Sequence, residues 1–309
     1  MGIIKIIVSI IILVLIINII DVEELKKLFL QISFLNILYF CLFFSIIVPL
    51  LAFRWFLIFY KENKDLKFIY FFKLTYESFF LNQFLPAPLS GDAYKYFVGR
   101  ENNTIPKYLN SIIIDRIIGI YTLFTTLYIL FFLFFETNFN NIYFMIVSLI
   151  VLNLFFFYLI RILCMKKINS YFPLFFQVFL IEFYEVLIQK KFKYVLIVSL
   201  FERFLIMFLF IKILNLLMPN ESLFYLIRII FFFNISLFFA SIPISFGGWG
   251  IRESSLLYLG SLYGDNLEIL FLSSAIFGLV LMIISIPGFF LLIQNKMWMK
   301  FLKKNKNNV

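Results

Sequence analysis

The sequence predicts an all-α protein that crosses a lipid bilayer several times. Of its 309 residues, 63% are hydrophobic and only 14% are charged, whereas soluble domains are about 45–50% apolar and about 25% charged. So few polar residues could not cover that much apolar surface in water. The charged residues also gather between long apolar runs, and about 20 helical residues are enough to cross the hydrocarbon core. We therefore expect an integral membrane protein.

The composition also excludes several functional classes. The net charge is +10, but the Lys and Arg residues stand at the ends of apolar segments, which fits membrane topology better than nucleic-acid binding. Cys41 and Cys164 both lie in apolar runs and are too few for a disulfide scaffold. Histidine is absent, which excludes His-based acid–base catalysis and His-ligated metal sites.

Eight apolar segments are expected to be helical and to enter the membrane. They are 3–20, 34–60, 68–85, 111–135, 142–163, 194–216, 222–242 and 268–293. The first resembles a signal peptide, but no small-residue cleavage site follows it, so we interpret it as an uncleaved span. The third is short and carries Lys73, Glu77, Asn82 and Gln83.

The distribution of Lys and Arg predicts the topology, because basic connections stay in the cytoplasm. The basic connections are 61–67, 86–110, 161–193 and 295–309, and the connections poor in Lys and Arg are 21–33, 136–141, 217–221 and 243–267. With the first set inside, both termini are cytoplasmic and six segments cross fully. Segments 68–85 and 222–242 then become re-entrant hairpins entered from opposite faces. The alternative is eight plain spans, which exports the basic connection 161–193 unless 171–189 also crosses.

Segment 171–189 is interpreted as a helix in the membrane interface. Glu182, Glu185 and Gln189 form a narrow polar stripe on an otherwise apolar helix. The chain is thus expected to form one membrane domain, 1–294, followed by a basic cytoplasmic tail, 295–309.

The two re-entrant segments end in similar motifs. One is Asn82-Gln83-Phe84-Leu85-Pro86-Ala87-Pro88-Leu89-Ser90-Gly91-Asp92, and the other runs from Pro243 through Gly247-Gly248-Trp249-Gly250 to Arg252-Glu253. Proline ends a helix and glycine permits a tight reversal. Broken helices entered from opposite faces are typical of inverted repeats, which place binding sites near the bilayer midplane. Two ordinary loops are the alternative. The glycines do not form a dinucleotide fingerprint, because no strand precedes them.

Ionisable residues inside the apolar segments are a second signal. Asp115-Arg116 and Glu202-Arg203 lie within segments, as does Glu77. Each such charge costs about 2.5–3.5 kcal/mol on insertion scales and therefore usually faces protein or water. Neighbouring residues on a helix point about 100° apart, so partners on other segments are expected. Snorkelling to the interface is the alternative for Asp115 and Arg116.

At these residues the sequence resembles the membrane region of lysylphosphatidylglycerol synthases and their stand-alone, flippase-like relatives. The resemblance covers essentially the whole chain. It rests on Asn82, Leu85-Pro86, Gly91-Asp92 and Lys95, on Asp115-Arg116-Ile117-Ile118-Gly119, and on Pro243, Gly247-Gly248, Gly250 and Arg252-Glu253. The family more often has Arg at the position of Lys95 and Glu at that of Asp115. Lys keeps the charge but loses the bidentate fork that grips a phosphate.

The resemblance implies translocation, between the leaflets of a bacterial plasma or inner membrane, of an anionic, aminoacylated or polyprenyl-linked lipid. Aminoacyl transfer in the family belongs to a separate soluble domain, which we do not expect in this chain, so an enzyme is not expected. The alternatives are a membrane-embedded transferase acting on a lipid phosphate, with Asp92, Asp115 or Glu253 as base or metal ligand, and a non-catalytic membrane partner of a glycosyltransferase or aminoacyltransferase.

The expected substrate is held by helix ends and charged side chains. Arg252 and Glu253 with the three glycines would form one half of the site, Asn82, Asp92 and Lys95 the other, and Asp115 and Arg116 would lie beside them. The candidate substrate-binding residues are Asn82, Pro86, Gly91, Asp92, Lys95, Asp115, Arg116, Pro243, Gly247, Gly248, Gly250, Arg252 and Glu253. No cofactor, metal or nucleic acid is expected.

Overall fold

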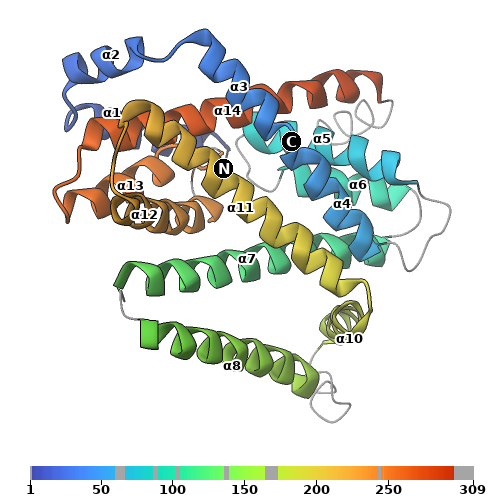
Figure 1. Ribbon diagram of the computed structural model, residues 1–309. Helices are drawn as coiled ribbons and strands as arrows, with labels where there is room; N and C mark the ends of the chain where they lie inside the picture. The colour runs from blue at the N-terminus through green and yellow to red at the C-terminus, as the bar shows by residue number, and fades with distance from the viewer. Residues whose placement is uncertain are drawn as a thin grey trace.

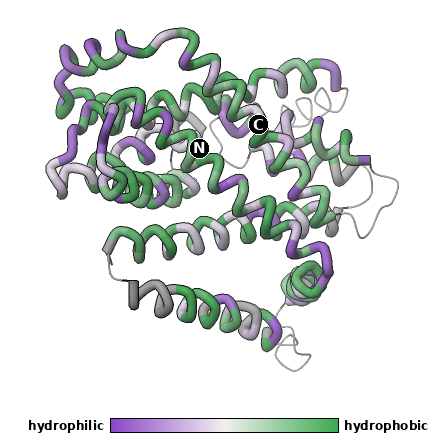
Figure 2. Tube along the Cα trace, in the orientation of Figure 1, coloured by the Kyte–Doolittle hydropathy of each residue, from purple (hydrophilic) through white to green (hydrophobic). Residues whose placement is uncertain are grey.

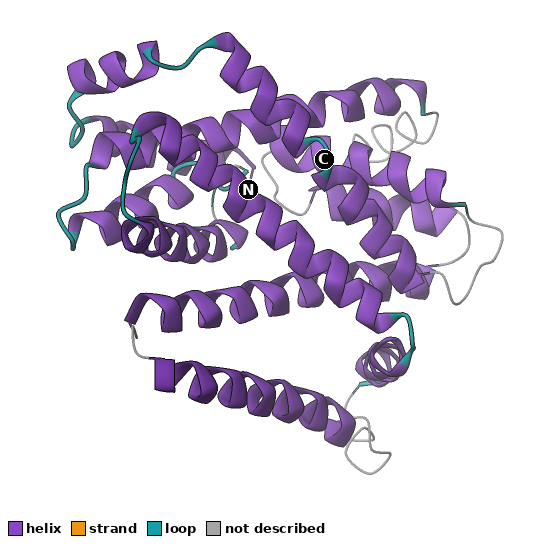
Figure 3. Ribbon diagram, viewed as in Figure 1, coloured by secondary structure: helices purple, strands orange, loops and turns teal. Residues whose placement is uncertain are grey.

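A computed structural model describes residues 2–59, 67–85, 90–101, 105–135, 139–163, 173–242, 245 and 247–295. Every regular element in these ranges is a helix (Figure 3). The helices are α1 (Gly2–Ile17), α2 (Val22–Leu30), α3 (Phe34–Phe44), α4 (Ile47–Phe59), α5 (Phe68–Phe84), α6 (Ser90–Glu101), α7 (Ile105–Phe135), α8 (Phe139–Leu163), α10 (Leu174–Ile188), α11 (Phe192–Leu217), α12 (Leu223–Ser241), α13 (Ile251–Ser261) and α14 (Leu267–Gln294) (Figure 1).

The protein is a multi-pass helical membrane protein, as predicted. Among the described residues, five helical stretches are long and apolar enough to cross a bilayer: Phe34–Phe59, Tyr108–Phe134, Phe192–Leu217, Leu223–Ser241 and Leu267–Gln294. Apolar residues cover nearly the whole length of these helices (Figure 2). Helix α12 is among them, although the sequence analysis assigned it to a re-entrant segment. Helix α1 has 16 residues, which at 1.5 Å per residue is about 24 Å.

Two local features differ from the sequence expectation. The segment 34–60 is divided into α3 and α4 at Ser45, whose hydroxyl donates to the carbonyl oxygen of Leu42 over 2.7 Å. The connection 21–33 contains the helix α2, which begins where the Asp21 carboxylate accepts from the backbone N–H of Glu23 at 2.8 Å. An Asp in this position satisfies donors that the first helical turn leaves free.

The element order repeats. A long helical stretch, a helical hairpin and a long helix occur as α3–α4, α5–α6, α7 and again as α11, α12–α13, α14. The two sets exchange partners, because α5 packs against α14, α12 packs against α7, and α4 packs against α11. Helices α7 and α14 therefore each run from one hairpin to the other (Figure 1).

The turn before α13 lies against the end of α5. A Cβ placed on Gly247, in the α12–α13 turn, would lie 3.6 Å from the carbonyl oxygen of Gln83 near the end of α5. Gly247, Gly248 and Gly250 have φ angles of 57°, 82° and 86°, a region that other residues enter only with strain. In the first hairpin, a Cβ on Gly91 would lie 2.1 Å from the carbonyl oxygen of Ser78. Glycine there allows α6 to lie directly on α5.

Helix α10 confirms the helix expected in 171–189, with Leu174–Ile188 as its bounds. Phe179 and Phe183 are buried in a cluster with residues of α4, α7 and α11. Glu182 of the predicted polar stripe accepts a hydrogen bond from Asn110 of α7 at 2.6 Å. At least this part of the stripe therefore faces protein.

Candidate functional site

The centre of the site is an arginine that joins three helices. Arg54 of α4 binds the carboxylate of Asp115 on α7 with two donors, Nε at 2.7 Å and Nη2 at 3.1 Å. Its Nη1 donates to Glu202 of α11 at 2.5 Å. The side chains of Arg54 and Glu202 are 6% and 7% exposed. Both carboxylates thus have their partner on another helix, as the sequence analysis expected.

The first hairpin adds two cations to this centre. Arg116 of α7 donates to Asp92 of α6 through Nε at 2.8 Å, and the Arg116 side chain is 48% exposed. Lys95, one turn further along α6, is buried, and its ammonium lies 4.2 Å from the centre of the Trp55 ring. None of the ion pairs between described residues involves Lys95. Asp92 and Asp115 act on it only at longer range.

Arg203 is the fourth cation. Its Nη2 donates to the carbonyl oxygen of Gly119 at 3.2 Å, while its Nε is buried and has no hydrogen-bond partner among the described residues. A buried donor without a partner costs about 1–3 kcal/mol. Arg203 therefore retains binding capacity for an acceptor from outside the chain.

Together these side chains form what we call the charge cluster. Its members are Arg54, Asp92, Lys95, Asp115, Arg116, Glu202 and Arg203. Four cations against three carboxylates leave one positive charge when all are ionised. The cluster has an exposed edge at Arg116 and a buried end at Glu202, which is the eleventh residue of the 26-residue α11. That position is about 15 Å along the helix from its start.

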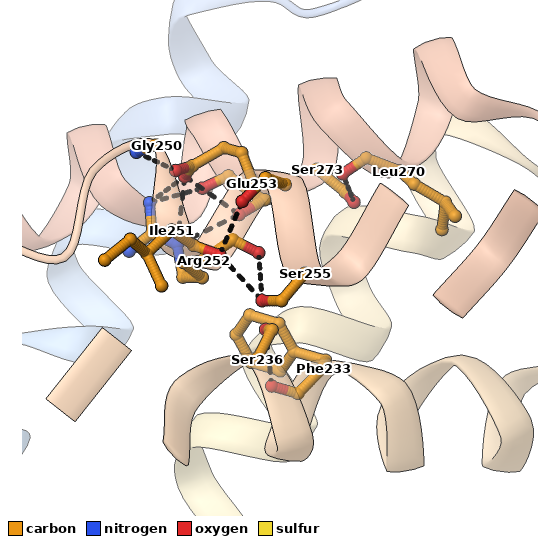
Figure 4. A network of polar contacts seen from close by, with 11 residues as sticks. Phe233, Ser236, Gly250, Ile251, Arg252, Glu253, Ser255, Leu270 and Ser273 are labelled. Carbon is orange, nitrogen blue, oxygen red and sulfur yellow. Dashed lines mark hydrogen bonds and ion pairs between the residues drawn. The ribbon is translucent and has the colours of Figure 1, made fainter. Parts of the chain in front are cut away.

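The second hairpin holds its charges differently. Arg252 binds Glu253 through Nη2 at 2.5 Å, and both residues are buried. Arg252 also donates from Nε to the hydroxyl of Ser274 at 2.9 Å, which in turn donates to Glu253 at 3.0 Å. The other oxygen of Glu253 accepts from the backbone N–H of Gly250 at 2.7 Å and caps α13 (Figure 4).

The aromatic rings around Arg252 complete its enclosure. The guanidinium carbon lies 5.4 Å from the ring centres of both Trp249 and Phe277. Polar groups are thus satisfied inside the protein, as buried ion pairs require. The pair joins the start of α13 to α14.

Other predicted residues have structural contacts. The side chain of Asn82 accepts from the backbone N–H of Gly91 at 2.9 Å and so caps α6. Gly247, Gly248 and Gly250 form the turn before α13. The structure brings Asp92, Lys95, Asp115 and Arg116 together in the charge cluster and keeps Arg252 and Glu253 in a separate network. Pro86 and Pro243 lie outside the described residues.

Arg54 and Trp55 are not among the residues predicted from the sequence. The available signal was that Arg54 is the only charged residue within the apolar run 34–60, and a lone intramembrane charge needs a partner. A second polar cluster was not predicted either. Glu77 of α5 accepts from the hydroxyl of Tyr94 at 2.8 Å and from the amide of Asn295 at 3.1 Å, which ties the first hairpin to the end of α14.

The all-helical fold with several apolar spans, repeated hairpins and a buried ionic cluster defines a polytopic membrane protein with a polar interior. The family model described as the lysylphosphatidylglycerol synthase TM region matches residues 2–288. The chain therefore belongs to this family, as its motifs indicated. Searches of curated proteins and of solved structures returned no match.

Proposed function

We propose that this protein moves a lipid with an anionic head group between the two leaflets of a bacterial plasma membrane. The observation that carries the proposal is the charge cluster. It has one more cation than carboxylates, a buried Arg203 nitrogen without a partner, and a buried Lys95 outside any ion pair among the described residues. Charge-assisted bonds from Arg and Lys are the usual means of holding a phosphate.

The extent of the cluster supports movement rather than binding alone. Arg116 is half exposed, whereas Glu202 and Arg203 lie near the middle of α11. Polar groups at such depth are costly in lipid and usually line a pathway. A head group entering beside Arg116 would meet Lys95 and then Arg203 without entering hydrocarbon.

The membrane topology is part of the proposal. The α5–α6 and α12–α13 hairpins would be re-entrant from opposite faces, with six full spans and both termini in the cytoplasm. Support comes from the repeated element order and from the contact between Gly247 and Gln83. Irregular backbone at membrane depth is tolerated where protein or a wet cavity surrounds it. A cysteine at Lys190 should then resist labelling by an impermeant reagent from outside intact cells.

The two halves of the site have different roles in this proposal. Asp92, Lys95, Asp115 and Arg116 contact the phosphate or balance its charge, and Asn82 caps the start of α6, which carries Asp92 and Lys95. Arg252 and Glu253, with the three glycines, hold the second hairpin turn against Gln83 and form the other half. Partner glycosyltransferases or aminoacyltransferases would supply or consume the lipid.

The decisive experiment is a flux assay in liposomes. Phosphatidylglycerol and phosphatidylcholine carrying a fluorophore on an acyl chain are each exposed to an impermeant quencher. The protein should bring inner-leaflet phosphatidylglycerol to the quencher faster than phosphatidylcholine. Chromatography of the recovered lipid should find its head group unchanged, whereas an altered head group would indicate a transferase instead.

Lys95→Gln is the informative variant. Lys95 forms no ion pair with a described residue, so its removal leaves no described carboxylate without its partner. One charge-assisted hydrogen bond is worth about 1.5–3 kcal/mol, so flux should fall by about tenfold or more. The matched control is Lys212→Gln, since Lys212 is a lysine above the Phe208 ring on α11, away from the charge cluster. Unchanged flux in a well-folded Lys95→Gln protein would place the site elsewhere.

A further inference from the structure

A cavity between the ends of α8 and α10 lies apart from the charge cluster. It has a volume of about 310 Å³ and is lined by Tyr158, Arg161, Tyr184, Leu187 and Ile188. The two helices contact each other, and α8 otherwise packs against α7 (Figure 1). The lining thus combines one cation, two phenols and two aliphatic side chains, with no carboxylate.

The polar groups of this cavity are not used within the described part of the chain. No ion pair or hydrogen bond between described residues involves Arg161, and the same holds for the hydroxyls of Tyr158 and Tyr184. Arg161 is exposed. A guanidinium offers five N–H donors in a fork that fits phosphate oxygens. Two neighbouring hydroxyls can donate to the same phosphate or accept from head-group hydroxyls.

The aliphatic side of the cavity continues along α8. Val147, Val151, Leu154 and Tyr158 are each more than half exposed, and their spacing of four, three and four residues puts them on one helix face. This stripe is about 16 Å long at 1.5 Å per residue, a length comparable with that of an acyl chain. It ends at the Tyr158 hydroxyl, beside Arg161.

We propose that the α8–α10 cavity is a binding site for an anionic glycerophospholipid, distinct from the charge cluster. The phosphate binds Arg161 with the Tyr158 and Tyr184 hydroxyls, the glycerol backbone contacts Leu187 and Ile188, and one acyl chain follows the α8 stripe. Membrane proteins place Arg and Tyr at the depth of the lipid head groups. The head group of a lipid bound in this cavity would therefore lie at the same depth as in the surrounding bilayer. The apolar walls favour a lipid over a free phosphate ion.

The test uses the full protein in vesicles of equal phosphatidylglycerol and phosphatidylcholine. A benzophenone amino acid replaces Ile188 at the rim of the cavity, and the cross-linked lipid is identified by mass. Phosphatidylglycerol adducts should exceed phosphatidylcholine adducts by about tenfold. Both lipids carry the phosphate, but only phosphatidylcholine brings a choline cation toward Arg161, and only phosphatidylglycerol has head-group hydroxyls for the two phenols. The same amino acid at Ile283, exposed on α14 away from both the cavity and the α8 stripe, should show no preference. Glycerol phosphate in excess should leave the adducts unchanged.

Two variants test whether the preference for phosphatidylglycerol arises in the cavity. Arg161→Gln should remove it, and Tyr184→Phe should reduce it several-fold. Lys190→Gln removes an exposed cation two residues beyond Ile188 that does not line the cavity, so it should leave the preference intact. Equal adducts of the two lipids in the unmodified background would overturn the proposal, as would an effect of Lys190→Gln equal to that of Arg161→Gln. Competition by glycerol phosphate would show a soluble phosphate ligand instead.

Discussion

The two hairpins, α5–α6 and α12–α13, share an arrangement but treat their charges in opposite ways. Each has a second helix whose start is capped by a side chain. In the first hairpin the cap is the neutral Asn82, and the charged side chains Asp92 and Lys95 are directed to other helices. In the second the cap is Glu253, which also binds Arg252.

The difference shows which hairpin can offer charge to a ligand. Arg252 donates from Nε and Nη2 to Glu253 and Ser274, and aromatic rings cover the Arg252–Glu253 ion pair. Any ligand of Arg252 would have to displace these contacts. Around the first hairpin, by contrast, Lys95 and Arg203 keep donors that no described residue accepts. The charges of the second hairpin are paired within the protein, whereas the first hairpin can offer polar side chains to a ligand.

Removing the arginine at the centre of the charge cluster should have the largest effect. Arg54→Gln leaves the buried Glu202 and the partly buried Asp115 without their cation, and the loss of a buried partner costs about 3–5 kcal/mol. We expect a large drop in the thermal unfolding temperature of the purified protein and little folded material. Arg54→Lys should recover part of it, because Lys keeps the charge but lacks the bidentate geometry.

The control for this change is Lys26→Gln, at an exposed cation on α2. Its unfolding temperature should match that of the unmodified protein. If the unfolding temperature of Arg54→Gln equals that of the unmodified protein, Arg54 does not hold Asp115 and Glu202, and the charge cluster does not exist as proposed.

A change in the second hairpin should cost somewhat less. Arg252→Ala leaves Glu253 with two donors, the Ser274 hydroxyl and the Gly250 N–H, so we expect a loss of about 3 kcal/mol at most. Because Arg252 is also expected to form half of the lipid site, Arg252→Ala should stop lipid movement in the molecules that remain folded. Flux per folded molecule, measured beside the melting temperature, separates these effects.

The double variant Arg252→Met with Glu253→Gln sharpens this prediction. It removes both charges together, and buried pairs replaced by uncharged groups often cost little. Stability restored with full flux would make the pair purely structural. Stability restored without flux would give the second hairpin a direct part in transport.

Much of the fold could be predicted from local signals. Apolar runs of sufficient length gave the long helices, and the Pro- and Gly-containing turns gave the helix pairs α5–α6 and α12–α13. The break at Ser45 was missed although Pro49 signals it, because a proline ring clashes with the carbonyl of the residue four positions earlier, here Ser45. The helix α2 was hidden because its charges were interpreted as a connection, although Asp21 offered a capping signal.

The site was less predictable, because burial and pairing depend on contacts between distant helices. Asp115 and Glu202 could be recognised as costly charges in apolar helices, but nothing local joins them to Arg54, 61 and 148 residues away in sequence. Likewise, the motif around Arg252 looks like an open binding turn. Only the packing of Ser274 and Phe277 on α14 encloses it.

The smallest effect on stability, and the sharpest comparison, should come from the cap of the first hairpin. Asn82→Ala removes the acceptor for the Gly91 N–H, and losing such a cap costs about 0.5–2 kcal/mol. The matched control is Ser222→Ala, because Ser222 caps α12 by accepting from the Tyr225 N–H at 3.2 Å, away from the charge cluster. Both variants should lower the melting temperature by similar small amounts. Only Asn82→Ala should also slow lipid flux, since a loosened α6 start moves Asp92 and Lys95 relative to Arg116. Equal flux in the two variants would mean that the precise position of the first hairpin does not matter for transport, and the contrast between the two hairpins would then lose its functional meaning.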